Sequence, residues 1–207
     1  SANLKNLFNP RSVAVIGASH HPEKIGHKIF KNILEGGFKG KVYPVNPQGD
    51  QILKRQVYRR IEDLPEPVDA ACLVIPAEFV LEAVRQCGRK GVKFLIIISA
   101  GFSEIGNIAE EKSIKMAAEE FGIRIIGPNV FGIYSASASL NATFSSSRIK
   151  PGNLAIVSQS GALGIALIGK TKEMGLGLAS IASVGNQCDL EVSDILEYLK
   201  DDQNTKI

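Results

Sequence analysis

The sequence predicts an α/β fold: a Rossmann-like parallel sheet in the first part and a second, incomplete α/β unit after it. Two observations predict it. Short, continuously apolar runs alternate with helical patterns, which is typical of a parallel sheet covered on both faces. A serine-rich stretch, 135–150, then separates this alternation from a new strand and helix pattern.

The elements of the first part follow in order. Glycines mark helix ends, and Pro76 suits a first helical turn. Such sheets bind ligands outside the carboxyl ends of their strands, so the loops that follow each strand are the ones of interest. Strands are expected at Ser12–Gly17, Lys41–Val45, Ala70–Ile75, Phe94–Ile98 and Arg124–Ile126, with helices at Gly26–Gly36, Ala77–Cys87 (stopped by Gly88) and Ile108–Phe121 (stopped by Gly122).

The second part offers fewer elements. Two strands and two helices bury a sheet poorly, so the unit is expected to be truncated and the chain to be a fragment of a longer protein. The predicted organisation is a domain over 1–135, a connection over 136–152 and a partial domain over 153–207. Its elements are expected at Leu154–Val157, Gly161–Glu173, Leu178–Val184 and Val192–Leu199.

The composition excludes several classes. The chain has 207 residues, 44% hydrophobic and 22% charged, with a net charge of +3, which indicates a globular protein and favours neither a nucleic-acid nor a membrane partner. Three widely spaced cysteines, Cys72, Cys87 and Cys188, indicate reduced thiols and a cytoplasmic location rather than a disulfide framework or a metal site.

The loop Gly17–Gly26 predicts a phosphate site. A glycine closes the first strand and Gly26 opens a helix, whose N–H groups attract anions, although the pattern is not GxGxxG. The carboxylate that NAD requires after the second strand is missing, since that place reads Val45-Asn46-Pro47. Lys24, Lys28 and Lys41 suit a ligand with several phosphates, such as coenzyme A; the alternative is that these glycines serve packing alone.

The histidines give a weaker signal. His20 and His21 are adjacent in a loop and lack other metal ligands, so we expect them to be exposed to solvent. His27, early in the first helix, is expected either to contact a phosphate or to pack.

Two loops in the second part carry polar residues. Ser158–Ala162 joins a strand to a helix and suits an anion cradle, or is an ordinary capped helix start. It does not match GxSxG and no histidine follows it, so serine catalysis is not expected. The second loop is Gly185–Asp189. There we expect either that Asn186 and Asp189 face a shared ligand, or that Asp189 caps the next helix. Cys188 is expected not to act as a nucleophile.

Ten segments, in order along nearly the whole chain, resemble a known family. They resemble the α part of ADP-forming acetyl-CoA synthetase, an acyl-CoA synthetase of the nucleoside-diphosphate-forming kind related to the succinyl-CoA synthetase α subunit. Bacterial protein acetyltransferases carry a similar non-hydrolytic copy. The segments are SVAVIGAS, the IGH helix start, KVYPVNP, EDLPEPVD, VIPA, SAGF, GPN, LNATF, SQSGA and GNQCD.

The resemblance implies a CoA-binding Rossmann-like domain and a flavodoxin-like ligase domain. It implies that acyl-CoA and phosphate give acyl phosphate and CoA, and that the phosphoryl group passes to a histidine and then to ADP. The residues implied for CoA are Gly17, Ala18, Ser19, Lys24, Ile25, Gly26, Val45, Asn46, Pro47, Ile75, Pro76, Ala77, Ser99, Ala100, Gly101 and Asn129. Those implied for phosphate are Ser158, Gln159, Ser160, Gly161, Ala162 and Asn186.

The same resemblance implies partners, and this sequence also departs from the family pattern at some positions. The partners are a small carboxylic acid, Mg-ADP/ATP on an ATP-grasp domain or β subunit, and an oligomer. The phosphohistidine is expected beyond Ile207, so this chain alone is expected to be inactive. Gln48 replaces a lysine common in relatives, and Phe131 is expected to alter the fit of the acyl group. The alternatives are a CoA-binding regulatory module of a protein acetyltransferase and an NAD-binding domain of an oxidoreductase.

Overall fold

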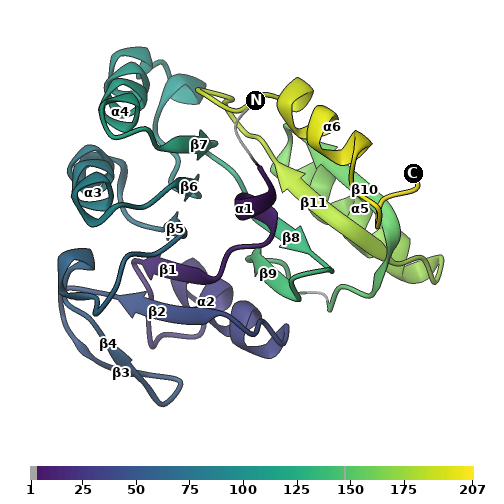
Figure 1. Cartoon of the computed structure of the whole chain (residues 1–207), viewed down its shortest axis with the longest axis horizontal. Helices are drawn as coiled ribbons and strands as arrows, with labels where there is room; N and C mark the ends of the chain where they lie inside the picture. The colour runs from purple at the N-terminus through teal and green to yellow at the C-terminus, as the bar shows by residue number, and fades with distance from the viewer. Residues whose placement is uncertain (1–3, 147) are drawn as a thin grey trace.

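The computed structural model describes residues 4–146 and 148–207 and contains two larger β-sheets (Figure 1). Residues 1–3 of the predicted first domain and residue 147 of the predicted connection lie outside the described residues. The first sheet has five parallel strands, which confirms the predicted parallel sheet. Its order is β2 (Lys41–Val45), β1 (Ser12–Ile16), β5 (Ala70–Leu73), β6 (Phe94–Ile97) and β7 (Arg124–Ile126).

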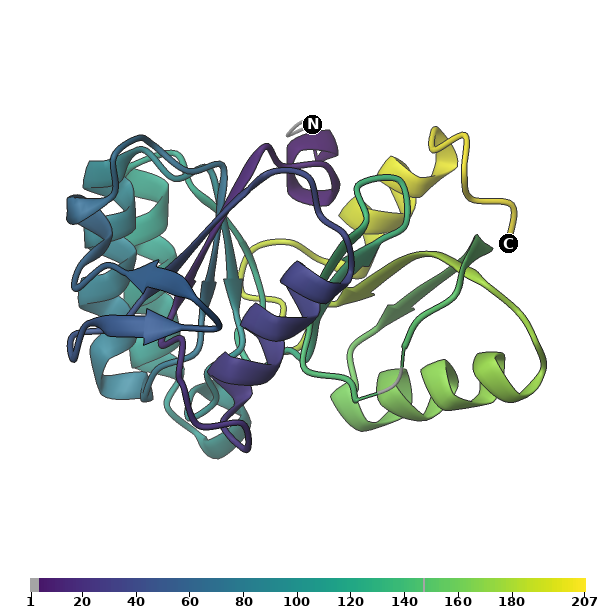
Figure 2. The same ribbon diagram turned by 90° about the horizontal axis from the view of Figure 1, so that it is seen from below.

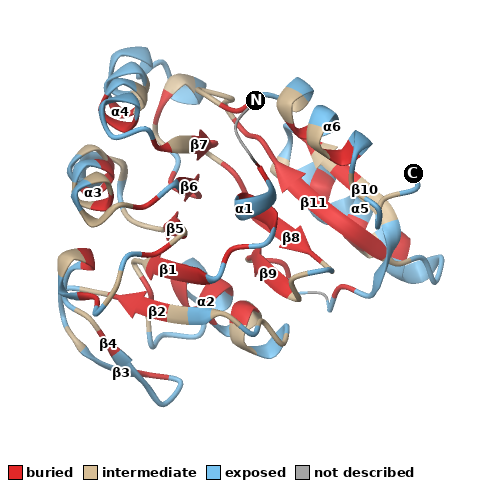
Figure 3. Ribbon diagram, viewed as in Figure 1, coloured by how far each residue is buried: buried red, intermediate tan, exposed pale blue. Residues whose placement is uncertain are grey.

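Helices cover both faces of this sheet. α3 (Ala77–Lys90) and α4 (Ile108–Glu120) lie on one face, and α2 (Ile25–Glu35) lies on the other, between the two sheets (Figure 2). β5 and β6 are buried along their whole lengths, as their unbroken apolar sequences require (Figure 3). The strand order reverses between β1 and β5, which makes the carboxyl ends of these two strands the expected place for a ligand.

Helix α3 is longer than predicted. It continues past Gly88 and ends at Gly91, which adopts a left-handed conformation with φ of 83°. Gly88 instead serves packing, because a Cβ there would lie 2.3 Å from the ring of Phe121 at the end of α4. The prediction that Gly88 stops the helix was therefore wrong.

A small hairpin, absent from the sequence prediction, follows β2. β3 (Asp50–Ile52) pairs antiparallel with β4 (Arg55–Val57). The short helix α1 (Lys5–Phe8) and two 3₁₀ turns, η1 (Ile61–Asp63) and η2 (Ser103–Ile105), complete this part of the chain.

The second sheet has four strands. Its order is β10 (Pro151–Ser158), β11 (Leu178–Ser183), β8 (Gly132–Ser135) and β9 (Leu140–Thr143). β10 and β11 are parallel, whereas β8 and β9 run antiparallel, so the sheet is mixed. α5 (Gly161–Glu173) and α6 (Val192–Lys200) lie on opposite faces of it (Figure 2).

The sequence predicted β10, β11, α5 and α6 but not β8 and β9. β9 falls within the stretch expected to be a connection, 136–152, and pairs with β8 over four residues. That stretch is therefore partly sheet. The division of the chain into domains at these positions stays a prediction.

The two sheets share a core. One hydrophobic cluster includes Val13 and Val15 of β1, Ala142 of β9 and Ile195 of α6. Asn32 of α2 reaches across, because its amide nitrogen donates to the carbonyl oxygens of Thr143 and Ser145 at 2.7 and 2.9 Å. Among the described residues, no helix has the length and apolar character needed to cross a bilayer.

Candidate functional site

The loop after β1 depends on two glycines. Gly17 has a φ of +93°, and a Cβ there would lie 2.1 Å from the carbonyl oxygen of Val74, just after β5. A Cβ on Gly26, in the first turn of α2, would lie 1.9 Å from the carbonyl oxygen of Gly17. These contacts bring the start of α2 directly against the strand end at the point where the strand order reverses.

The start of α2 is open to an anion. Its N-cap residue, Lys24, is exposed and gives no side-chain hydrogen bond to the helix. The first N–H groups of a helix carry a partial positive charge, which favours a phosphate. Lys41 was also predicted to serve here, but it lies at the opposite end of β2 and its Nζ is 2.7 Å from Glu66. That expectation was wrong.

The three histidines divide into one buried residue and two exposed ones. His27 is buried, and its Nδ1 lies 2.8 Å from the carbonyl oxygen of Ser19, so it packs and holds the loop after β1. His20 and His21 are exposed, as predicted, with ring centroids 4.1 Å apart. Over residues 4–146 and 148–207, no group of three or more His, Cys, Asp or Glu side chains is placed to hold a metal ion.

The loop after β2 is tied to the loop after β1. Asn46 donates from Nδ2 to the carbonyl oxygen of Ala18 at 2.8 Å, and its Oδ1 accepts from the N–H of Gln48 at 2.9 Å. The side chain of Val45 is buried, whereas its carbonyl oxygen accepts from the N–H of Gly17 at 2.9 Å. Val45 therefore supports the loop, while Pro47 next to it is exposed.

The loops after β5, β6 and β7 continue this edge. The hydroxyl of Ser99 accepts from the N–H of Ile75 at 3.1 Å and donates to the Ile75 carbonyl at 2.5 Å. The N–H of Asn129 donates to the carbonyl oxygen of Ser99 at 3.0 Å. A Cβ on Gly101 (φ +114°) would lie 3.1 Å from that of Ala77. Pro76 and Ala100 are exposed beside these contacts.

The serine loop of the second sheet caps a helix. Ser160 is the N-cap of α5, and its hydroxyl accepts from the N–H of Leu163 at 3.3 Å. Ser158 is buried and donates to the carbonyl oxygen of Ser160 at 2.9 Å. Three residues at the start of this helix are exposed to solvent: Gln159, Ser160 and Ala162. The capped helix and the anion cradle are compatible, because backbone N–H groups would serve the anion.

Phe131 packs beneath this loop, where a Cβ on Gly161 would lie 3.8 Å from the Cβ of Phe131. It is 1% exposed and lies beneath α5, where a Cβ on Gly164 would be 2.4 Å from its ring. It also makes an edge contact with Phe144, with ring centroids 6.4 Å apart. The ring is enclosed by these neighbours, and the expectation that Phe131 alters the fit of an acyl group stays a prediction.

The loop after β11 faces the first sheet. β10 and β11 are parallel, so Gly185–Asp189 lies at the same sheet edge as Ser158–Ala162, as predicted. Asp189, however, does not cap α6. It receives Nε of Arg124 at 2.9 Å and the N–H of Ile125 at 2.7 Å, and Glu191 is the N-cap of α6. The prediction that Asp189 caps the next helix was therefore wrong, whereas its facing a shared ligand with Asn186 stays a prediction.

Asn186 and Cys188 also bind to the first sheet through their backbones. The N–H of Asn186 donates to the carbonyl of Pro128 at 2.9 Å, and that of Cys188 to the carbonyl of Gly127 at 3.0 Å. Burial, and then the charge of Glu111, raise the pKa of the Cys188 thiol to about 12. A thiol with so high a pKa is a poor nucleophile at neutral pH, which supports the passive role predicted for it.

Two glutamates that the sequence did not single out lie at this junction. Glu104 of η2 accepts from the N–H groups of Gly101 and Phe102, at 2.5 and 3.2 Å. Glu111 of α4 accepts from the N–H of Ser103 at 3.1 Å. Despite desolvation, the hydrogen bonds that Glu104 accepts from Gly101, from the side chain of Asn186 and from Phe102 lower its pKa. The Gly-x-x-Glu spacing after a strand is the one sequence signal that could have indicated it.

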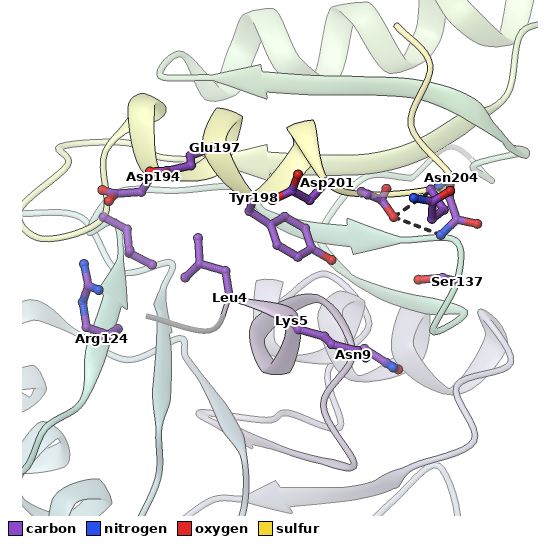
Figure 4. Close-up of a pocket in the computed structure, with 13 residues that line it drawn as sticks. Leu4, Lys5, Asn9, Arg124, Ser137, Asp194, Glu197, Tyr198, Asp201 and Asn204 are labelled. Atoms are coloured by element: carbon purple, nitrogen blue, oxygen red, sulfur yellow. Dashed lines mark hydrogen bonds between the residues drawn. The ribbon is translucent and has the colours of Figure 1, made fainter. Parts of the chain in front are cut away.

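A cavity among the described residues lies elsewhere. It has a volume of about 670 Å³ and is bordered by α1, β7, α6 and the residues after α6 (Figure 4). Its charged lining is negative on balance, with the acidic side chains Asp194, Glu197, Asp201 and Asp202 against the basic side chains Lys5 and Arg124. Such a lining repels a polyphosphate, so the charge argues for the glycine-rich loops rather than this cavity as the anion site.

Two families match the sequence. Residues 11–136 match the CoA binding domain, and residues 151–207 match the succinyl-CoA ligase like flavodoxin domain. The first match includes the whole five-stranded sheet, and the second begins where β10 begins.

Individual relatives match almost the whole chain. The α subunit of acetate–CoA ligase [ADP-forming] I from Pyrococcus furiosus is 49% identical over 99% of this chain and 46% of its own length. The acetate–CoA ligase [ADP-forming] of Methanocaldococcus jannaschii is 43% identical over 99% of this chain and 29% of its own length. The chain thus spans less than half of these relatives.

Solved structures agree. The dinucleotide-forming acetyl-coenzyme A synthetase 1 of Ca. Korarchaeum cryptofilum superposes with a TM-score of 0.96 and 46% identity, over 98% of this chain and 44% of that one. A second structure of that synthetase, in complex with phosphate and ADP, superposes equally well.

Proposed function

The chain belongs to the CoA binding domain family, and from that premise we propose that it is the CoA-binding portion of an ADP-forming acyl-CoA synthetase. The observation that carries the proposal is the close approach of Gly26 to Gly17 where the strand order reverses, which leaves the start of α2 open to a diphosphate. CoA would supply the thiol that carries the acyl group.

The residues around that point suit the parts of CoA. Lys24 and the N–H groups of Ile25 and Gly26 would meet the diphosphate, with Ala18 and Ser19 beside them. Asn46 and Pro47 would flank the adenosine, and Ile75, Pro76 and Ala77 the path of the pantetheine. Ser99, Gly101 and Asn129 then lie toward the second sheet, which suits the thiol end of the ligand.

The reaction we propose for the full-length protein converts acyl-CoA, ADP and phosphate into acid, CoA and ATP. A phosphate oxygen attacks the thioester carbonyl, the carbon–sulfur bond breaks, and CoA leaves as the thiol with the acyl phosphate as the other product. Ser158–Ala162, at the start of α5, would hold the phosphate. The phosphohistidine, the Mg-ADP/ATP site on an ATP-grasp domain or partner subunit, and the acid substrate belong to this proposal.

Calorimetric titration with CoA tests the binding part. We expect CoA to bind and NAD⁺ not to bind, because the end of β2 reads Val45-Asn46-Pro47 and lacks the carboxylate that would hold a ribose. Lys24→Ala should weaken CoA binding roughly tenfold, the typical effect of losing one charged phosphate contact. Lys31→Ala, on the same helix but paired with Glu35 at 3.7 Å, is the matched control and should bind as the wild type does.

The opposite pattern would contradict the proposal. Binding of NAD⁺ without CoA binding would favour the oxidoreductase alternative. Equal affinities of Lys24→Ala and Lys31→Ala for CoA would show that the start of α2 is not part of the CoA-binding site.

A further inference from the structure

The polar groups of Asn186 are fully engaged at the junction of the two sheets. Its Nδ2 donates to Glu104 at 2.6 Å and to Glu111 at 2.8 Å, which uses both of its N–H groups. Its Oδ1 lies 3.4 Å from Nδ2 of Asn129. Asn186 follows β11, whereas its three partners follow or cover β6 and β7, so the contacts cross from one sheet to the other (Figure 1).

The two carboxylates are themselves anchored. Glu104 and Glu111 accept from three successive backbone N–H groups, Gly101 to Ser103, in addition to Asn186. Asn107 adds a bond from its Nδ2 to the carbonyl of Gly101 at 2.9 Å. Charged acceptors bound to several fixed donors form stronger hydrogen bonds than neutral ones. The loop after β6 therefore presents Asn186 with a fixed pair of acceptors.

We propose that Glu104, Glu111 and Asn186 form a clasp that positions the loop after β11 against the thiol-end loops after β6 and β7. Asn186 is then a positioning residue, because a direct phosphate contact through its N–H groups would require the clasp to open. The catalytic consequence of the clasp rests on the proposed function. In that function the clasp fixes the distance between the thioester, near Ser99–Gly101, and the phosphate, near Ser158–Ala162.

The clasp itself is tested without reference to any reaction. Hydrogen–deuterium exchange of residues 184–190 should be faster in Glu104→Gln and Asn186→Ala than in the wild type, because the Asn186 and Cys188 amides would lose support. Glu110→Gln, an exposed neighbour on α4, is the matched control and should exchange as the wild type does. Unchanged exchange in both clasp variants would overturn the clasp.

The catalytic consequence is tested in the full-length enzyme with its partner subunit. Glu104→Gln and Asn186→Ala should each lower kcat roughly tenfold, as expected for misplaced reactants, with the Kd for CoA unchanged. The double variant Glu104→Gln/Asn186→Ala should lose little more than either single variant, because both remove the same interaction.

The results separate the two proposals. Failure of the wild type to bind CoA would contradict the proposed function, while the exchange experiment would still decide on the clasp. A wild-type kcat in both variants, or a loss of CoA affinity that accounts for the whole effect, would overturn the positioning role.

Discussion

Most of the candidate site is formed by individual residues in the loops at the strand ends. The sequence predicted Gly17 and Gly26 as site residues because a glycine that closes a strand and one that opens a helix suit a phosphate loop. The roles of Phe131 and Asp189 could not be identified in this way. Phe131 is enclosed under α5 and Asp189 is paired with Arg124, and both contacts join segments far apart in the chain. A local pattern contains no information about such partners.

At this scale the close approach of Gly26 to Gly17 can be tested. Gly26→Ala should destabilise the protein by about 1–3 kcal/mol, because the new methyl group would overlap a fixed backbone carbonyl. Gly169→Ala in α5 has open space around its Cβ and should instead stabilise by about 0.5–1 kcal/mol through better helix propensity. Urea unfolding measures both. Similar effects of the two substitutions would show that the contact is not tight.

At the scale of elements, the sequence predicts what local composition determines. All five parallel strands, the three helices α2, α3 and α4, and the four elements β10, α5, β11 and α6 were predicted within a few residues. The hairpin β3–β4 was not, because its turn residues Leu53 and Lys54 have φ of 48° and 63° without the usual Asn-Gly signal. β8 and β9 were missed because serine and alanine dominate the stretch around them.

Strand β2 offers a test of pH dependence. Burial, and then the hydrogen bond to Glu66, raise the pKa of Tyr43 from its ordinary 10.0 to about 12. The folded protein therefore holds this proton more tightly than the unfolded chain does. The stabilisation is fully present below pH 10 and is lost as the pH rises from about 10 to about 12.

Tyr43→Phe removes this titration. The free energy of unfolding of the variant should fall less steeply than that of the wild type across that alkaline range. The tyrosinate absorbance of the wild type minus that of the variant should report the raised pKa directly. A difference spectrum that titrates at the ordinary value would contradict the prediction.

At the scale of the whole molecule, the two sheets are joined by a shared hydrophobic core. The ring of Phe8 in α1 stacks on Tyr198 of α6 at 4.8 Å, and both belong to or border the cluster that also contains β1. Unfolding should therefore be a single cooperative transition despite the two families matched along the chain.

Phe8→Ala tests this cooperativity. The substitution should cost about 3–5 kcal/mol, the usual cost of truncating a fully buried phenylalanine, and should lower the stability of both sheets together. Thiol labelling during urea unfolding, with the labelled peptides identified by mass spectrometry, can follow Cys72 in β5 and Cys188 after β11 separately. Burial raises the pKa of both thiols to about 12, so both react slowly until the protein unfolds. Coincident midpoints are expected in the wild type and in the variant; separated midpoints would show two independent units.

The contact between His27 and the loop after β1 has a spectroscopic consequence. A carbonyl oxygen can only accept, so the imidazole must carry its proton on Nδ1 while it faces Ser19. The tautomer is thus fixed by the loop, and the nitrogen-15 resonances of a single buried ring become an intrinsic reporter of that loop. Arrival of any ligand that shifts the Ser19 carbonyl would be visible there without attaching a label.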